Sequence, residues 1–88
     1  MNQNTIAETV GRFIRINFLF DENAELSNQK SLLGSGVIDS TGVLELIAFL
    51  EQQFKVKFED SELVVENFDT VEKIGQFVIR KTKSEATA

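Results

Sequence analysis

The residues whose types and spacing suit chemistry lie in one short run, GSGVIDSTG, at positions 34–42. This run places Asp39 and Ser40 on a glycine-rich segment, directly before the most regular apolar pattern of the chain. Asp39 is the natural N-cap of a helix that starts at Ser40, because its carboxylate can accept hydrogen bonds from first-turn amides. Side chains in that turn point back toward the N-terminal end of the helix, so we expect the Ser40 hydroxyl to be exposed.

Two interpretations of the Ser40 hydroxyl follow from the residues around it. The free amides and the dipole at a helix start attract anions, above all a phosphate. The chain contains no histidine and no cysteine, so the usual general base for a serine nucleophile is missing and thiolate chemistry is excluded. We therefore expect any chemistry at Ser40 to be carried out by a partner protein. The alternative is that Asp39 and Ser40 only start a helix.

Composition excludes several classes of function. Fourteen acidic residues against nine basic ones give a net charge of −5, which disfavours nucleic acid as a ligand. An acidic surface suits docking onto basic partners, although it also simply favours solubility. No loop has EF-hand spacing, so we predict no metal site. The chain shows neither a transmembrane stretch nor a signal sequence, which predicts a cytoplasmic protein without membrane insertion.

The apolar periodicity predicts a small all-α protein. The length of 88 residues predicts a single domain over residues 1–88, and we expect it to be a monomer. We expect a four-helix bundle with a long polar loop between the first two helices and a short third helix. The first helix has Thr5 and Glu8 as a capping box, with Asn4 as a competing cap. Strand pairing is the alternative for the third segment, and the tail 82–88 is expected to be disordered. The predicted helices span about 5–19, 40–54, 59–65 and 70–81.

The run GVIDSTGVLELIAFLEQQFKVKFED resembles the segment around the attachment serine of acyl carrier proteins. In that family, Asp-Ser opens the second helix and is followed by a mixed apolar and acidic stretch. The matching elements here are Asp39-Ser40, LELI at 44–47, Leu50-Glu51 and Phe54. FDTVEKIGQFV further on is similar to the last helix of the family. The likeness covers about residues 5–81 in helix order.

The resemblance implies a non-catalytic carrier. A phosphopantetheinyl transferase would move 4′-phosphopantetheine from coenzyme A onto Ser40, making a phosphoprotein, with Asp39 and Thr41 beside the attachment point. The thiol of this arm would hold an acyl group as a thioester. The implied partners are that transferase, a loading ligase specific for an acyl or aminoacyl group, and a downstream acyl transferase or synthase.

The resemblance also implies two sets of contact residues. Helix two would face partner enzymes, with Asp39, Glu45 and Glu51 as contacts to their basic residues; a solvated helix face is the alternative. Phe49 falls off the core stripe, and we expect it to be an exposed docking anchor. The predicted cargo crevice between helices two and three is lined by Val43, Ile47, Phe58 and Leu63, which are otherwise plain core.

Several positions depart from the fatty-acid carriers of the family. Thr41 replaces a leucine and Gly42 an acid, while Lys55 and Lys57 follow a helix whose surroundings are usually acidic. These departures favour a specialised pathway of fatty-acid, polyketide or lipid biosynthesis over bulk fatty-acid synthesis. In this respect the sequence resembles D-alanyl carrier proteins, in which a glycine likewise follows shortly after the serine. An aminoacyl cargo is therefore the alternative. A further alternative is an unmodified helical interaction module.

Overall fold

The first helix starts earlier than the sequence predicts. The computed structural model describes residues 2–86, and the side chains of residues 2–82. Helix α1 (Gln3–Asn17) is capped by Asn2, whose side-chain oxygen accepts a 2.9 Å hydrogen bond from the amide of Thr5. The predicted caps Asn4 and Thr5 therefore lie inside the helix, because asparagine two residues upstream is as strong an N-cap as either.

A long connection follows α1 and is held in place by its few apolar residues. Leu32 and Ile38 are fully buried, while Leu33 and Val37 are half-buried. The amide of Leu32 donates to the carbonyl of Asp69 at 2.6 Å, which ties the loop to the residues just before the last helix. Irregular backbone is thus anchored at both its apolar and its polar groups before the chain enters the second helix.

The second helix confirms the prediction at both ends. Helix α2 (Ser40–Phe54) begins after Asp39, whose carboxylate Oδ1 accepts a 2.7 Å hydrogen bond from the amide of Gly42. It ends at Lys55, which has a left-handed backbone with φ of 57°. Leu46, Leu50 and Phe54 are buried at helical spacing, which fixes the rotation of α2 and leaves its opposite face in solvent.

The predicted third helix at 59–65 is two shorter pieces. A 3₁₀ helix, η1 (Asp60–Glu62), is closed by a capping box between Glu59 and Glu62. The chain is then extended at Val64, and helix α3 (Val65–Phe68) follows. The break arises where β-branched residues disfavour a continuous helix, and the side chain of Asn67 donates to the carbonyl of Glu62 across it at 2.9 Å.

The last helix, α4 (Val71–Ala86), starts as predicted and runs further. Thr70 Oγ1 accepts a 3.0 Å hydrogen bond from the amide of Lys73, so Thr70 caps the helix. The expectation of a disordered tail from residue 82 is wrong for 82–86, because the lysine and alanine residues there favour helix without needing an apolar anchor. Residues 87–88 of that predicted tail lie outside the described part of the chain.

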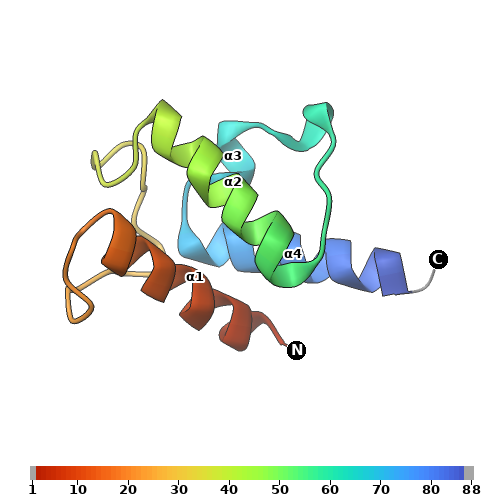
Figure 1. Cartoon of the computed structure of the whole chain (residues 1–88), viewed down its shortest axis with the longest axis horizontal. Helices are drawn as coiled ribbons and strands as arrows, with labels where there is room; N and C mark the ends of the chain where they lie inside the picture. The colour runs from red at the N-terminus through yellow and green to blue at the C-terminus, as the bar shows by residue number, and fades with distance from the viewer. Residues whose placement is uncertain (1, 87–88) are drawn as a thin grey trace.

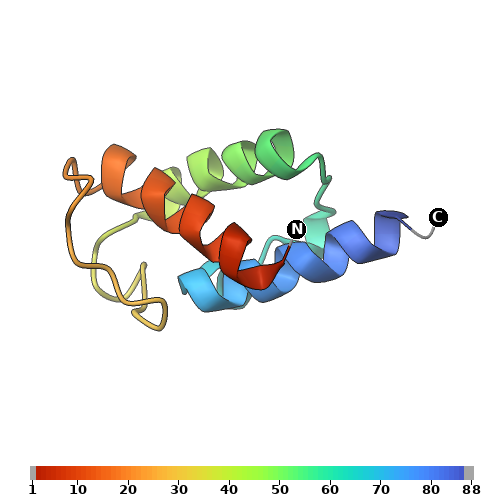
Figure 2. The ribbon, with the colours of Figure 1, turned by 90° about the horizontal axis from the view of Figure 1, so that it is seen from below.

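The helices form the predicted all-α bundle around α4. Helix α4 packs against each of the other three helices, and Figure 1 shows α2 crossing in front of it. Figure 2, seen from below, shows α1 alongside α4, with α2 forming the remaining side of the bundle. No strand occurs within residues 2–86, which excludes the alternative of strand pairing there. No helix in the described range is long and apolar enough to cross a membrane.

The core is entirely apolar. Phe58, Phe68 and Phe77 form a cluster with ring centroids 5.4–5.7 Å apart. Among the described residues, no polar or charged side chain is buried. Stability therefore rests on apolar burial, and the polar groups act at the loops and helix ends. The other fully buried side chains come from α1, α2, α4 and the long loop: Ile6, Val10, Ile14, Leu32, Ile38, Leu46, Leu50, Val71, Ile74 and Val78.

Candidate functional site

The start of α2 presents the Ser40 hydroxyl to solvent. Asp39, Ser40 and Thr41 are all exposed. The carboxylate of Asp39 is committed to the amide of Gly42 at 2.7 Å, and its carbonyl accepts from the amide of Val43 at 3.0 Å. Asp39 therefore holds the first turn in place. The remaining amides of that turn, at Ser40 and Thr41, have no acceptor within the helix.

This geometry suits a phosphate ester on Ser40. A phosphate attached to the serine oxygen would lie against the first-turn amides and the positive end of the helix dipole. The exposed hydroxyl leaves space for an enzyme to deliver the group. The described part of the chain contains no group of three or more Asp, Glu, His or Cys side chains that could hold a metal ion. The Ser40 side chain is thus open to a molecule that approaches from solvent.

A close contact between Phe18 and Gly42 fixes the position of this first turn. Gly42 is buried, and a Cβ atom there would lie 2.8 Å from Cε1 of Phe18 and 3.0 Å from Cγ2 of Ile38. Only glycine allows the Phe18 ring to approach the helix backbone this closely. Gly42, one of the positions at which this sequence departs from the fatty-acid carriers, is therefore required by local packing.

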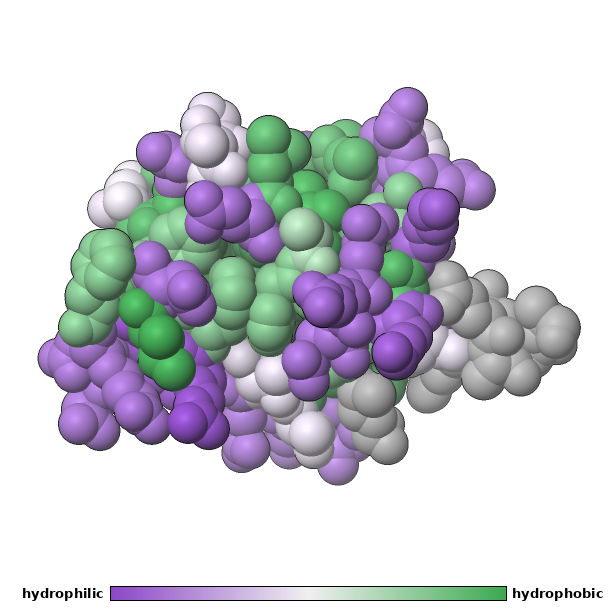
Figure 3. All heavy atoms as spheres, in the orientation of Figure 1, coloured by the Kyte–Doolittle hydropathy of each residue, from purple (hydrophilic) through white to green (hydrophobic). Residues whose placement is uncertain are grey.

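An apolar crevice of about 180 Å³ opens beside Ser40. Its two sides come from α2 and from the segment Leu63–Val65, which we call the outer wall. The outer wall is unusually exposed for apolar residues, with 58% of Val65 accessible to solvent. Apolar residues gather between hydrophilic ones on the face drawn in Figure 3. The lining residues are Leu33, Ser40, Val43, Ile47, Leu63, Val64, Val65 and Phe68.

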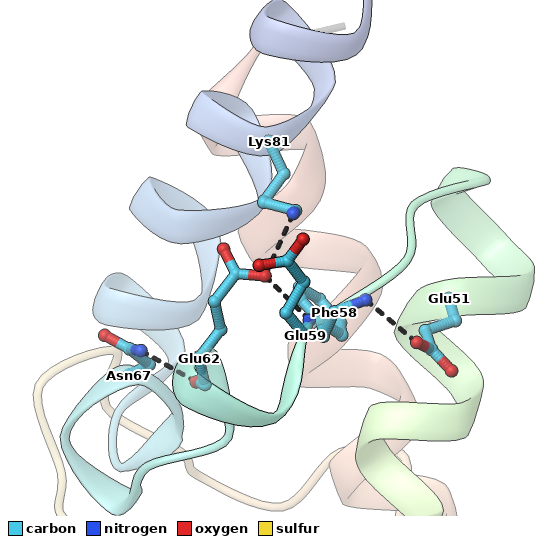
Figure 4. A network of polar contacts seen from close by, with 6 residues as sticks. All are labelled: Glu51, Phe58, Glu59, Glu62, Asn67 and Lys81. Atoms are coloured by element: carbon cyan, nitrogen blue, oxygen red, sulfur yellow. Dashed lines mark hydrogen bonds and ion pairs between the residues drawn. The ribbon is translucent and has the colours of Figure 1, made fainter.

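Polar contacts connect the chain segment that carries the outer wall to both α2 and α4. Figure 4 shows Glu51 of α2 reaching the amide of Phe58, at 3.0 Å, and Lys81 of α4 reaching Glu62, also at 3.0 Å. Glu62 additionally accepts from the amide of Glu59 at 2.8 Å. These hydrogen bonds, first that from Glu59 and then that from Lys81, hold the pKa of Glu62 below its usual range. The position of the outer wall is thereby fixed from two sides.

The structure brings together three of the four predicted crevice residues. Val43, Ile47 and Leu63 line the crevice, but Phe58 does not. Phe58 is buried in the core, stacked on Phe77, because the turn after α2 directs it inward. The sequence could not separate these cases, since all four positions are apolar and lie on α2 or in the segment that follows it.

The predicted docking residues divide in the same way. Glu45 is exposed, one turn beyond Thr41, and Asp39 is exposed at the cap. Glu51 is only half-buried and accepts from Phe58, so its carboxylate has a structural partner. The expectation that Phe49 is exposed is wrong, because its ring is half-buried and stacks on Phe13 with centroids 4.0 Å apart.

Two features of the site are not anticipated by the sequence. Leu44 is 65% exposed, one turn after Ser40, so the exposed apolar side chain on α2 is Leu44 and not Phe49. Val64 and Val65 line the crevice from the outer wall. The available signal is the run of three apolar residues at Leu63–Val65, which fits neither a helical stripe nor a strand alternation.

Comparison with known protein families supports a carrier. A family model described as "Phosphopantetheine attachment site" matches residues 4–78. The chain is 41% identical over 60 residues to a D-alanyl carrier protein of Streptococcus uberis, covering 68% of this chain and 76% of that protein. It is 40% identical over 60 residues to the D-alanyl carrier protein of Streptococcus pyogenes serotype M5, with the same coverage.

A solved structure gives a second comparison. It is the crystal structure of the Bradyrhizobium japonicum glycine:[carrier protein] ligase complexed with its cognate carrier protein and an analogue of glycyl adenylate. The matching chain has a TM-score of 0.67 and 27% sequence identity. The match covers 89% of this chain and 96% of that chain.

Proposed function

We propose, from the premise that this chain belongs to the phosphopantetheine-attachment family of carrier proteins, that it carries an amino acid on an arm attached to Ser40. The prosthetic group of the family is 4′-phosphopantetheine, held covalently. The observation that carries the choice of residue is the exposed Ser40 hydroxyl in the first turn of α2, beside amides that lack helical acceptors.

Attachment requires a partner enzyme. The Ser40 oxygen attacks the pantetheine-bearing phosphorus of coenzyme A, forming a new O–P bond. The bond from that phosphorus to 3′,5′-adenosine diphosphate breaks, and the hydroxyl proton passes to a base on the transferase. We assign the role of Asp39 to the helix start, where its Oδ1 accepts from the Gly42 amide, and place the base on the transferase. The chain's own part is to hold Ser40 at a fixed helix start, with first-turn amides near the developing negative charge.

The aminoacyl cargo is favoured by two independent comparisons. The curated relatives are named D-alanyl carrier proteins, and the structural neighbour is the carrier of a glycine ligase. The attached arm supplies a terminal thiol on which such a cargo is held as a thioester. We accordingly propose a ligase that activates a small amino acid as the loading partner.

An acyl cargo is the second candidate, and one observation favours it. The crevice beside Ser40 is lined by apolar side chains and contains no charged residue among those described. A short acyl chain would be compatible with such a lining. Its volume of about 180 Å³ lies below the usual range of ligand pockets, about 300–1,000 Å³, so a long chain would not fit.

We further propose that partners dock on the exposed face of α2. Glu45 offers a carboxylate to a basic partner, and Leu44 offers an apolar contact beside it. Docking would bury Leu44 and leave Glu45 at the edge of the contact. An apolar centre with a polar rim is typical of protein interfaces. Glu51 contributes less to docking in this proposal, since its carboxylate supports Phe58.

The proposal is tested by intact mass. The chain is incubated with coenzyme A, Mg²⁺ and a broad-specificity phosphopantetheinyl transferase, beside Ser40→Ala and Thr41→Ala. We expect one phosphopantetheine on the wild type and on Thr41→Ala, and none on Ser40→Ala. Absence of modification by several transferases would favour an unmodified interaction module.

Cargo is then compared on the modified protein. A D-alanine ligase, a glycine ligase and an acyl-adenylating ligase are each supplied with ATP and their substrates. We expect loading by at least one of the amino-acid ligases. Loading by the acyl ligase alone would replace the aminoacyl proposal with the acyl one.

A further inference from the structure

We propose that two copies of this chain pair reversibly through a groove between α1 and α2, each copy inserting Phe20 into the groove of the other. The groove has a volume of about 300 Å³ and shares no lining residue with the crevice beside Ser40. Phe49 and Gln53 of α2 line the groove, whereas other residues of α2 line the crevice. The inference therefore does not depend on the function proposed for Ser40.

Apolar side chains from both helices line the groove. Phe13 of α1 and Phe49 of α2 are stacked and half-buried, and Ile16 beside them is 43% exposed. Figure 3, in the orientation of Figure 1, shows apolar side chains gathered over α1 and α2 on this face. An apolar cavity of roughly 150 Å³ already accommodates benzene, so the groove has room for one aromatic side chain.

Phe20 is the aromatic side chain that suits this groove. It is 84% exposed, more than any other large apolar residue of the described chain. Its backbone is left-handed, with φ of 55°, which a bulky residue rarely adopts. The turn holds it there, because the amide of Asp21 donates to the carbonyl of Arg15 at 3.0 Å. The fold thus presents an ordered aromatic ring to solvent, and little conformational freedom is lost when a partner covers it.

The charges around the groove complement those beside Phe20. Of the described residues that line the groove, only Arg12 is charged, while Asp21 and Glu22 follow Phe20 directly. Within one copy, Glu22 lies 3.5 Å from Arg12, so the loop that carries Phe20 borders the groove. The two side chains are 66% and 62% exposed, which makes this ion pair weak. The guanidinium of Arg12 retains donors for a second carboxylate.

Groove and aromatic ring belong to the same chain, so a two-fold axis makes the surface self-complementary. We place this axis beside Ile16, with the two α1 helices antiparallel. Phe20 is then about level with Phe13 of the second copy, and Asp21 with Arg12 of the second copy, because the chain advances equally on either side of the axis. Both grooves are filled at once, and Ile16 contacts Ile16 of the second copy at the centre.

The pairing should be weak and reversible. It uses one helix face and one loop, and two copies that each carry a net charge of −5 repel one another. We expect a dissociation constant of roughly 0.1 mM, typical of small transient interfaces, so that the chain is a monomer at low micromolar concentration. Ser40 and the crevice lie outside the groove and stay open in the paired form.

The first test is sedimentation velocity of the full chain from about 5 µM to about 1 mM at moderate salt. We expect the dimer fraction to rise over this range. Phe20→Asn should weaken pairing by at least about tenfold while the protein stays folded by circular dichroism, because asparagine tolerates a left-handed backbone. The matched control is Leu44→Asn, which removes another exposed apolar side chain, outside the groove, and should pair as the wild type does.

The second test exchanges charges between the two copies. Arg12→Glu and Asp21→Arg should each weaken self-association, because like charges then meet in the paired form. An equimolar mixture of the two variants should pair again, because each groove then faces a loop of opposite charge. A wild type that stays monomeric at about 1 mM would overturn the inference. Equal losses in Phe20→Asn and Leu44→Asn, or a mixture that pairs no better than either charge variant alone, would overturn it as well.

Discussion

The hydroxyl of Ser31 lies 2.9 Å from each carboxylate oxygen of Asp69. Asp69 also accepts from the amide of Leu33 at 3.2 Å, so one side chain fixes the loop that leads to Ser40. The contact is partly buried, which makes its loss costly because the loop groups lose their acceptor. We call the contacts of Asp69 with Ser31 and Leu33 the clamp. Because Leu33 lines the crevice, the clamp also supports the site.

Removing this clamp should destabilise the fold. We expect Asp69→Ala to lower the free energy of unfolding by about 2 kcal/mol and Ser31→Ala by about 1 kcal/mol. Asp21→Ala is the control, since Asp21 makes an exposed local hydrogen bond to Asn23, and its effect should stay within about 0.5 kcal/mol. Urea unfolding at neutral pH measures all three. Equal effects of Asp69→Ala and Asp21→Ala would refute the clamp.

Two glycines in helices should respond oppositely to alanine. Gly42→Ala forces a Cβ to within 2.8 Å of Phe18, and we expect a loss of about 1–3 kcal/mol in the free energy of unfolding. In Gly11→Ala the new Cβ meets only the flexible end of Arg15 at 3.4 Å, so better helix propensity should stabilise by up to about 1 kcal/mol. Thermal unfolding of both variants decides the matter, and a stabilised Gly42→Ala would contradict the packing argument.

The hydrogen bond from the Glu59 amide to Glu62, together with the ion pair to Lys81, should make stability depend on pH. Because the pKa of Glu62 is lowered in the folded state, its contribution is complete above the ordinary value of 4.5. That contribution is lost as the pH falls through the lower folded pKa. Glu62→Gln keeps an oxygen acceptor but removes the titration, and should lose less stability than wild type between about pH 5 and pH 3.

The comparison is made by urea unfolding at several pH values. Lys81→Met should give an intermediate slope, because the hydrogen bond from the Glu59 amide remains. Identical pH dependence in wild type and Glu62→Gln would show that this carboxylate does not contribute to acid unfolding.

Charge reversal on the exposed face of α2 should weaken transfer onto Ser40. We expect Glu45→Lys to raise the KM of the carrier for the transferase by about tenfold, with kcat little changed, since like charges would meet at the interface. Glu25→Lys makes the same charge change in the exposed loop and serves as control. Steady-state transfer at low salt gives both constants. An equal rise for the two variants would point to net charge in place of a docking contact.

Much of the fold can be predicted from local signals. The α2 cap at Asp39 and the buried residues of α4 follow from residue type and periodicity. The α1 start is missed because Asn2, Asn4 and Thr5 all suit an N-cap, and residue type alone does not rank them; the helix uses Asn2. The site is less predictable, because contacts between segments far apart in the sequence decide which apolar residues are covered. Phe49 lies within α2 and is covered because its ring stacks on Phe13 of α1, whereas Phe58 is buried by the path of the chain after Lys55.

The direction of α4 has a practical consequence for constructing fusions. Figures 1 and 2 place the end of α4 on the side of the bundle away from the start of α2. A fluorescent domain, an affinity matrix or a second module joined beyond α4 would therefore leave Ser40 accessible from the opposite side. Immobilised carriers could then be modified, loaded and discharged in turn by enzymes passed over the surface.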